Sequence, residues 1–411
     1  MSSTPREALP GIQRLGWINL FANAADQIAT VALPIVYVSK LAGDAGDTSI
    51  LTMAATLPLL IFSLPFGALA DRIQARSLLL TGECIRLVSL VGLILILLQP
   101  QPSLALISLL AIGGGTGTVA FQVAAPTLVA KATSGTTRQQ LNSSIELARS
   151  IAVTAGPPLA GVLVSLAGGS VALAVAAALV LTAVLAALRL PVVAEQPALK
   201  RRIRDDFAEG MRFTWRNPWL KPILLVSMFF NLGWYVLLGV IVAWANTELH
   251  MTSIGIGAMF ACYGLGMIAG AGFMKRKGAL LRETTLVQIG PWCGFAFASL
   301  VITTMLVQTQ LILFLAFFLI GTGPIVWTIT TINIRQTVTP ASLLGRVSAA
   351  IMFASAGGRP IGAGIGYIGF KLGGYPLVFA IALALFGTQA LMIGRTTLAK
   401  SQADTPEGLP A

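Results

Sequence analysis

The chain has 411 residues, of which 56% are hydrophobic and only 10% are charged, and its mean hydropathy is +0.84. Because soluble domains carry about 25% charged residues, this composition excludes an ordinary soluble protein and places most of the chain in a lipid bilayer. The formal net charge of +12 would suit a nucleic-acid-binding protein, unless the basic residues lie in short loops on one side of a membrane.

Twelve apolar segments are each long enough, at roughly 20 residues, to cross the ~30 Å hydrocarbon core of a bilayer. Several contain Gly and Pro, which transmembrane helices tolerate when neighbouring helices satisfy the backbone. We therefore predict an all-α polytopic membrane protein with twelve transmembrane helices. In chain order the predicted spans are residues 15–38, 49–70, 78–99, 103–126, 142–167, 170–189, 221–246, 252–274, 284–307, 310–334, 346–370 and 376–395.

The basic residues lie almost entirely on one side of this topology. Twenty-two of the 27 Lys and Arg residues fall in segments that share a side with the N-terminus, and only Lys40 and Lys371 fall in the opposite loops. The other three, Arg86, Arg149 and Arg359, lie within spans. The positive-inside rule then predicts a cell (inner or plasma) membrane protein with both termini in the cytoplasm. It also explains the net charge without nucleic acid.

The longest break between spans divides six helices from six. We expect an N-terminal half at residues 1–189, a cytoplasmic linker at 190–220, a C-terminal half at 221–396 and a cytoplasmic tail at 397–411. Within the linker, Phe207, Met211 and Trp215 recur every four residues among basic residues. This pattern suits a helix that lies on anionic membrane lipid, although a solvated linker with incidental aromatics remains an alternative.

The two halves also share a pattern. Residues 113–117 and 156–161 of the first half are Gly-rich, and residues 321–324 and 358–364 repeat this about 200 residues later. Because each half has an even number of helices, both run in the same sense. This is typical of parallel repeats related by an axis along the membrane normal.

Span 15–38 carries polar residues on one helical face, among them Asn19, Asn23, Asp26 and Gln27. Asp26 lies near the bilayer centre, where an ionised carboxylate costs at least ~3 kcal/mol. We therefore expect it to face a wet cavity, to find a cation or to bind a proton. A carboxylate that takes a proton from one side and releases it to the other would couple antiport. The alternative is a polar contact that only helps helices to associate.

Two acid–base pairs have the spacing i, i+3, Glu83 with Arg86 and Glu146 with Arg149, and both are expected in the cytoplasmic third of the membrane. One interpretation is that each pair neutralises its own charges or joins a network with Asp71. The alternative is that the pairs contact the solute directly. Arg359 has no obvious local partner, and either Asp26 or an anionic solute would neutralise it.

Residues 67–76 read Gly-x-Leu-Ala-Asp-Arg-x-x-x-Arg, directly after a charge-free apolar span. This loop resembles the one between the second and third helices of the major facilitator superfamily of secondary transporters. The resemblance implies a cytoplasmic latch that holds the two halves together, with Asp71 at the start of the span near Arg346. We expect the latch to comprise Gly67, Asp71, Arg72, Arg76, Glu83, Arg86, Glu146 and Arg149.

A second motif, Gly156-Pro157-x-x-Ala160-Gly161, looks like the superfamily motif associated with exporters, and its small residues would pack on span 252–274. In this superfamily the first helix of each three-helix repeat lines the cavity. The resemblance therefore implies solute or proton contacts from Asn23, Asp26, Gln27, Gln122, Asn231, Trp234, Tyr235, Trp327, Asn333 and Arg359.

The most specific likeness is to the enterobactin exporter and macrolide-efflux branch of the superfamily. It is carried by Glu209-Gly210-x-Arg212-Phe213-x-Trp215-Arg216-Asn217-Pro218, by Phe121-x-x-x-Ala125-Pro126 and by Gly345-Arg346-Val347. The resemblance implies export of a siderophore or drug-like solute in exchange for protons, by alternating access of the two halves. We expect a monomer.

Other classes of function find little support. The chain has one His, His250, and no phosphate-binding loop, so we expect neither an enzyme nor ATP drive, and no cofactor. Its three Cys residues lie in apolar runs and indicate no metal site or disulfide. Two alternatives stay open: a facilitator or importer of the same fold, and a non-transporting membrane sensor or scaffold.

Overall fold

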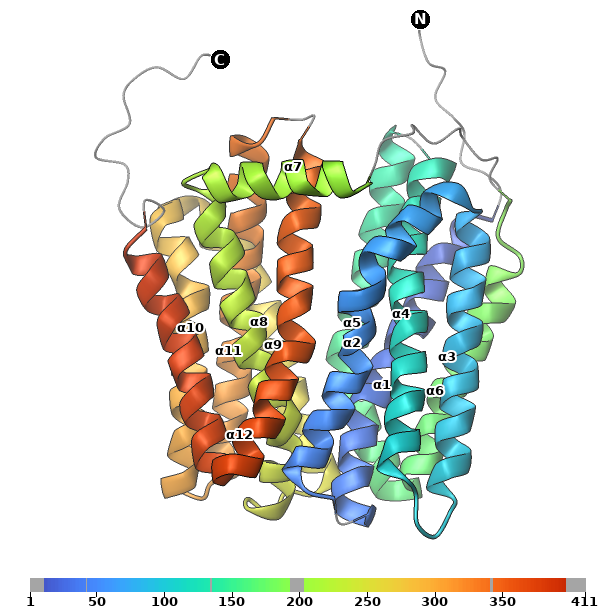
Figure 1. Cartoon of the computed structure of the whole chain (residues 1–411), viewed down its shortest axis with the longest axis vertical. Coiled ribbons are helices and arrows are strands. Elements are labelled where there is room, and N and C mark those ends of the chain that lie inside the picture. Colours follow the sequence, from blue (N-terminus) through green and yellow to red (C-terminus); the bar gives the residue numbers. More distant parts are fainter. Residues whose placement is uncertain (1–10, 42, 134, 193–202, 341–342, 397–411) are drawn as a thin grey trace, which may run out of the picture. The chain divides into compact units, whose positions relative to one another are not determined.

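The structure is a computed structural model, and it describes residues 11–41, 43–133, 135–192, 203–340 and 343–396. These residues form α-helices and one 3-10 helix, with no β-strand among them (Figure 1), so the predicted all-α class is confirmed. The helices are α1 (Arg14–Leu41), α2 (Ala45–Arg72), α3 (Ala75–Leu97), α4 (Leu104–Ala132), α5 (Gly135–Ala167), α6 (Gly169–Ala187), α7 (Ile203–Arg216), α8 (Leu220–Thr247), α9 (Ser253–Lys277), η1 (Gly278–Leu280), α10 (Glu283–Leu306), α11 (Gln310–Val338) and α12 (Leu344–Gly394).

The number of membrane spans agrees with the prediction. Within the described residues, 11 helices are long and apolar enough to cross a membrane, and α7, with 14 residues, is too short. The 51-residue α12 is broken at Gly373 and at Gly374, whose φ of 62° favours glycine. It therefore supplies two spans, and the total of twelve is confirmed. The break falls where the sequence predicts the last connection.

Local chemistry explains how the helices begin and how they satisfy their polar groups. At the start of α2, Asp44 Oδ1 accepts a hydrogen bond from Asp47 N (2.8 Å), and Asp47 Oδ2 accepts one from Asp44 N (3.2 Å). This reciprocal capping box satisfies two otherwise free donors. Inside the helix, the Thr52 and Thr56 hydroxyls each donate to the carbonyl four residues earlier, at 2.8 Å. Such bonds leave few unpaired polar groups to face lipid.

The described residues belong to two compact units. The first contains those of Met1–Lys200, Leu238–Ala261 and Gly366–Ile368, and the second contains those of Arg201–Leu237, Cys262–Ile365 and Gly369–Ala411. In the first unit α1 packs on α5 and α6, while α4 packs on α2 and α3. At the α3–α4 contact, a Cβ on Gly82 would lie 2.8 Å from Ala120 Cβ. Small residues therefore allow these two backbones to approach closely.

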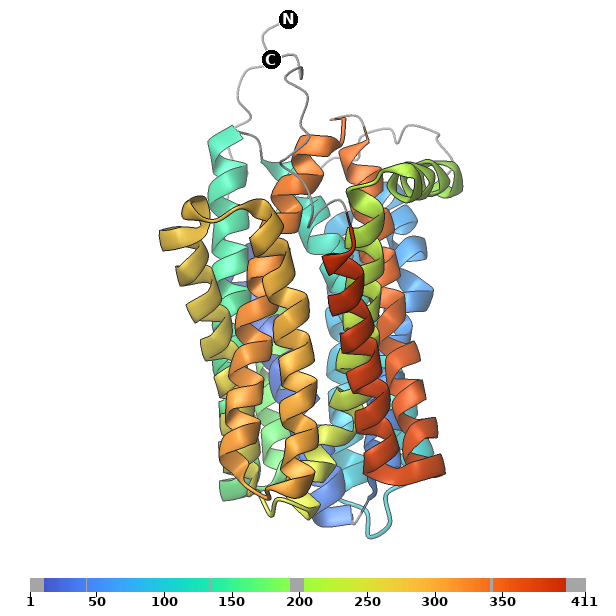
Figure 2. The same cartoon turned by 90° about the vertical axis from the view of Figure 1, so that its left-hand side faces the viewer.

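In the second unit α10 and α11 run side by side (Figure 2). A Cβ on Gly290 would lie 2.6 Å from Trp327 Cβ, so this pair also meets through a small residue. The short α7 lies across the ends of neighbouring helices of its unit (Figure 1). Its Phe207 ring meets Phe353 of α12 edge to face at 5.2 Å, whereas Trp215 is exposed and lies under Lys221 Nζ, 4.8 Å from the ring centre.

Candidate coupling and solute sites

Three charged side chains meet in the interior of the first unit. Arg86 Nη2 donates to Asp26 Oδ1 at 2.7 Å, and Arg86 Nη1 donates to Glu83 Oε1 at 2.6 Å. Arg86 also donates to the Ala22 carbonyl (2.7 Å), and the Thr118 hydroxyl donates to Asp26 Oδ1 (3.1 Å). The Arg86 cluster, as we call Asp26, Glu83, Arg86 and Thr118, thus joins α1, α3 and α4.

Close helix packing holds this cluster in place. Gly117 of α4 lies against Arg86, and a Cβ there would stand 2.5 Å from Arg86 Cγ. Because Arg86 lies about halfway along α3, it reaches α1 at the turn that carries Ala22 and Asp26. Arg86 is therefore deeper than the cytoplasmic third expected from the sequence.

The charges of the cluster do not balance when both acids are ionised, because one guanidinium faces two carboxylates. Glu83 is fully buried, and its Oε2 has no hydrogen-bond partner among the described residues. Asp26 keeps 29% of its side-chain surface exposed, against 4% for Arg86. Asp26 is therefore the most exposed of the three charged members, and its ionisation adds a net negative charge to the membrane interior.

The other predicted polar residues of the first unit form no hydrogen bond with the cluster among the described residues. Asn19 and Asn23 of α1 donate to the carbonyls of Leu15 (2.8 Å) and Asn19 (2.7 Å), so their amides mainly satisfy their own helix. Gln27 is half-buried and packs against Gly156, and Gln122 is exposed on α4.

In the second unit, Arg359 is a cation without a counter-charge among the described residues. Its Cζ lies 5.8 Å from the centre of the Tyr235 ring, and its buried Nε has no hydrogen-bond partner there. A cation–π contact contributes about 0.5–2 kcal/mol, whereas an Arg at the centre of a membrane helix costs about 2.5–3.5 kcal/mol. The contact with Tyr235 therefore offsets only part of the cost.

The remaining predicted lining residues of the second unit fall into two groups. Asn231 is half-buried beside Gly358, and Asn333 is exposed on α11. Trp234 instead stacks on Tyr263 at 5.5 Å, and Trp327 is buried in the core of the unit. Both tryptophans thus contribute to packing.

The loop after α2 is only partly described. The side chain of Asp71 is not among those that the structure describes, so its expected contact near Arg346 stays a prediction. Arg72 is exposed, and Arg76 Nη2 donates to the Leu188 carbonyl at 2.6 Å. A Cβ on Gly67 would meet nothing within 4 Å. Among the described residues, no close helix contact therefore depends on the missing side chain of Gly67.

The second acid–base pair, Glu146 with Arg149, has the predicted spacing, but it is exposed where the first pair is buried. Arg149 Nη2 lies 2.8 Å from Glu146 Oε2 on α5, and the two side chains are 60% and 62% exposed. The sequence analysis placed this pair in one latch with Glu83 and Arg86. In the structure, Glu83 and Arg86 form an interior cluster with Asp26, and the exposed pair is not part of it.

The Gly156–Gly161 stretch of α5 packs as its small residues suggest. Gly161 lies against Gly257 of α9, and a Cβ on Gly161 would stand 2.9 Å from Gly257 Cα. A Cβ on Gly257 would in turn lie 3.0 Å from the carbonyl oxygen of Pro157. This contact uses the beginning of α9, whereas Gly266, later in the same helix, faces α11.

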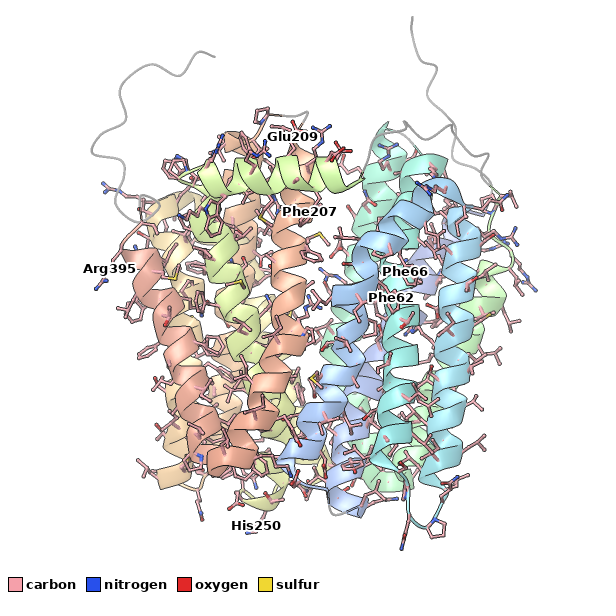
Figure 3. The ribbon with its side chains drawn as sticks, viewed as in Figure 1. Phe62, Phe66, Phe207, Glu209, His250 and Arg395 are labelled. Carbon is pink, nitrogen blue, oxygen red and sulfur yellow. The ribbon has the colours of Figure 1, made fainter. Side chains whose placement is uncertain are left out.

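Two features of these sites were missed from the sequence. Thr118 lies in a Gly/Thr-rich run that reads as helix packing, and no local spacing marks it as a partner of Asp26. Arg346, at the start of α12, pairs with Asp206 (2.9 Å) and Glu209 (2.6 Å) of α7; Glu209 is labelled in Figure 3. The only sequence signal for this pairing was the mixture of acids and bases in the linker.

The twelve membrane-length spans, which fall in two units of helices, define a multi-pass membrane protein. The chain matches the model of the Major Facilitator Superfamily over residues 15–363, and it belongs to that superfamily. Its members carry solutes and are not enzymes. The resemblance proposed from the sequence is therefore confirmed.

Two named relatives share about a quarter of their aligned residues with the chain. The chain is 28% identical to the multidrug efflux pump Tap of Mycolicibacterium fortuitum over 218 residues, which are 51% of this chain and 53% of that pump. The match thus spans about half the length of that relative. The chain is 25% identical to the enterobactin exporter EntS of Citrobacter koseri over 84% of this chain and 82% of that one.

Among solved structures, the nucleoside transporter NupG superposes with a TM-score of 0.67 over 94% of this chain and 98% of its own. The two sequences are 16% identical, so this likeness shows the shared fold alone.

Proposed function

We propose that the protein exports a small amphipathic solute, siderophore-like or drug-like, from the cytoplasm in exchange for protons. The observation that carries this proposal is the Arg86 cluster, in which one guanidinium faces two carboxylates and Asp26 is the one charged member that is partly exposed. The direction of transport is supported by the relatives, one of which is named as an efflux pump and the other as an exporter.

Proton coupling follows from the charge of this cluster. When Asp26 binds a proton, Arg86 and Glu83 remain as a neutral pair, which an apolar interior tolerates. When Asp26 releases the proton, the cluster carries one negative charge, and its free energy falls if water or a cation reaches it. A conformation that exposes Asp26 therefore favours the ionised form, and one that occludes it favours the protonated form. Proton binding thus shifts the conformational equilibrium.

Other expectations from the sequence complete the proposal. The protein acts as a monomer in the inner membrane with both termini in the cytoplasm, and its two halves alternate in exposing the solute. The latch residues around Asp71 stabilise one of these states. Phe207 of α7 packs on Phe353 of α12, so α7 rests on anionic lipid through its exposed Trp215 and the neighbouring basic residues. Loss of transport without loss of solute binding in Asp71→Ala is the result expected of a latch.

The test uses everted vesicles with an imposed pH gradient, to which siderophores and drug-like compounds are added in turn. Wild-type vesicles should show solute uptake that dissipates the gradient. Asp26→Asn should abolish coupled uptake while expression is retained, because the cluster then stays permanently neutral. The matched control is Glu248→Gln, an exposed carboxylate in the loop between α8 and α9, which should leave coupled uptake unchanged. Coupled uptake at the wild-type rate in Asp26→Asn would contradict the proposal.

The same vesicles separate the alternatives. A facilitator would equilibrate the solute without moving protons, and an importer would move it out of everted vesicles. A sensor or scaffold would move no solute.

A further inference from the structure

The least compensated charge in the second unit is Arg359. Among the described residues its guanidinium has one neighbour of note, the ring of Tyr235 at 5.8 Å, and its Nε is buried without an acceptor. Arg359 lies about halfway between the start of α12 at Leu344 and the break at Gly373. The guanidinium is therefore held within the span and away from either end.

Helix packing fixes this position. Gly358 and Gly362 flank Arg359 and bring α12 onto α8: a Cβ on Gly358 would lie 3.1 Å from Asn231 Cβ, and one on Gly362 would lie 3.1 Å from Tyr235 Cβ. Asn231, Tyr235 and Arg359 thus form one group, the Arg359 site, with a cation, an amide and an aromatic face. An arrangement set by two close glycine contacts is ordered before any ligand arrives.

No acid of the second unit neutralises this site among the described residues. The membrane-length helices of this unit contain a single acid, Glu283, at the first residue of α10. Of the acids on α7, Asp206 and Glu209 are bound to Arg346, and Asp205 is exposed. Asp26, which lies in the first unit, is bound to Arg86. An ionisable group that stays inside a membrane without a partner marks a functional site.

We propose that the Arg359 site binds the anionic group of the transported solute, a planar oxyanion such as a carboxylate that is carried on an aromatic body. A guanidinium presents two parallel donors to such a group, and a flat ring on the solute stacks on Tyr235. This proposal rests on the export function and narrows it to anionic amphipathic solutes. Neutral and cationic solutes would leave Arg359 uncompensated.

The experiment measures binding of 2-naphthoate and of its neutral counterpart 2-naphthamide to the purified full-length protein by calorimetric titration. Wild-type protein should bind the carboxylate at least ~10-fold more tightly than the amide, which corresponds to 1.4 kcal/mol. Arg359→Gln should lose this preference. Arg359→Lys should keep part of it, because lysine retains the charge and loses the bidentate geometry.

The matched control is Arg335→Gln. Arg335 lies in the same unit, and its Nε is also without a partner among the described residues, but it is three residues from the end of α11 and near the membrane boundary. This variant should keep the wild-type preference. Equal binding of the acid and the amide by wild-type protein would overturn the proposal, and so would an undiminished preference in Arg359→Gln. If Arg359→Gln does not fold, the wild-type and Arg359→Lys measurements decide.

Binding is measured without a proton gradient, so its outcome is separate from that of the export test. Failure of the anion site would leave the proton-coupled export proposal standing.

Discussion

Arg86 and Arg359 each lie near the middle of a membrane-length helix, one in each unit, and their surroundings are opposite. Arg86 is buried between two carboxylates, a carbonyl and a helix that closes over it. Arg359 meets one aromatic ring and no acid among the described residues. The Arg86 cluster therefore contains its own counter-charges and has one negative charge in excess when both acids are ionised, whereas Arg359 has a positive charge that the described side chains of its unit do not balance.

The two arginines should therefore respond in opposite ways to the loss of their charge. Removing the cation from a buried ion-pair network leaves uncompensated carboxylates. Removing an unpaired cation takes away a cost. Four principal substitutions, three of them with a control at a second position, test this contrast.

The largest effect is expected for Arg86→Gln. It leaves two acids buried without a cation, and we expect a loss of about 3–5 kcal/mol of stability, read as a fall in the midpoint of thermal unfolding of the purified protein. Arg149→Gln removes the arginine of the exposed pair with the same spacing and should cost about 0–1 kcal/mol. Adding Glu83→Gln to Arg86→Gln should restore part of the loss. Equal effects of the two single substitutions would mean that burial does not distinguish the pairs.

Gly117→Ala should have the next largest effect, because its Cβ would press on the side chain of Arg86 and on the backbone of α3. Overpacking of this kind costs about 1–3 kcal/mol. Gly67→Ala serves as the control, since the space beside Gly67 is open, and it should be neutral or gain up to about 1 kcal/mol from helix propensity. Thermal unfolding of both variants measures the contrast, and a destabilised Gly67→Ala beside an unchanged Gly117→Ala would contradict it.

A smaller effect is expected at the paired arginine of the second unit. Arg346→Ala breaks the ion pairs to Asp206 and Glu209, which are partly exposed, so we expect a loss of about 1 kcal/mol that shrinks at high salt. Hydrogen exchange should become faster at the amides of α7 and stay unchanged in α10 and α11. Arg216→Ala, at an exposed arginine at the end of α7, should leave the exchange of α7 unaltered.

The smallest effect, and one of opposite sign, is expected for Arg359→Met. This change removes an uncompensated cation and one cation–π contact, and stability should stay constant or rise by up to about 1 kcal/mol. The same thermal unfolding assay compares it directly with Arg86→Gln. A fall of several kcal/mol would show that Arg359 has a counter-charge after all and that the two units are alike.

The membrane spans could be predicted from the sequence because they depend on local properties. Hydropathy over about 20 residues marks each span, and even the break at Gly373 and Gly374 falls between two predicted spans. The polar face of α1 was likewise visible from helical spacing, which was enough to place Asp26 inside the membrane.

The partners of the charged residues depend on which helices meet, and local spacing does not contain that information. Spacing i, i+3 found both acid–base pairs, but it could not tell that Glu83 faces the interior of its unit while Glu146 is exposed. The bond from Arg86 to Asp26 joins residues 60 positions apart. A Gly in a membrane helix was equally ambiguous, since Gly117 is closely packed and Gly67 is not.

The turn at Gly373 and Gly374 has a consequence for how the chain enters the membrane. The two last spans are joined with almost no intervening loop, and the rings of Phe370 and Tyr375 meet across the turn at 5.1 Å. During synthesis the connection is therefore too short for the first of these spans to move into the lipid far from the second. The two should leave the translocation machinery together as a preformed helical hairpin, and an epitope inserted at this turn should impair biogenesis before it affects transport.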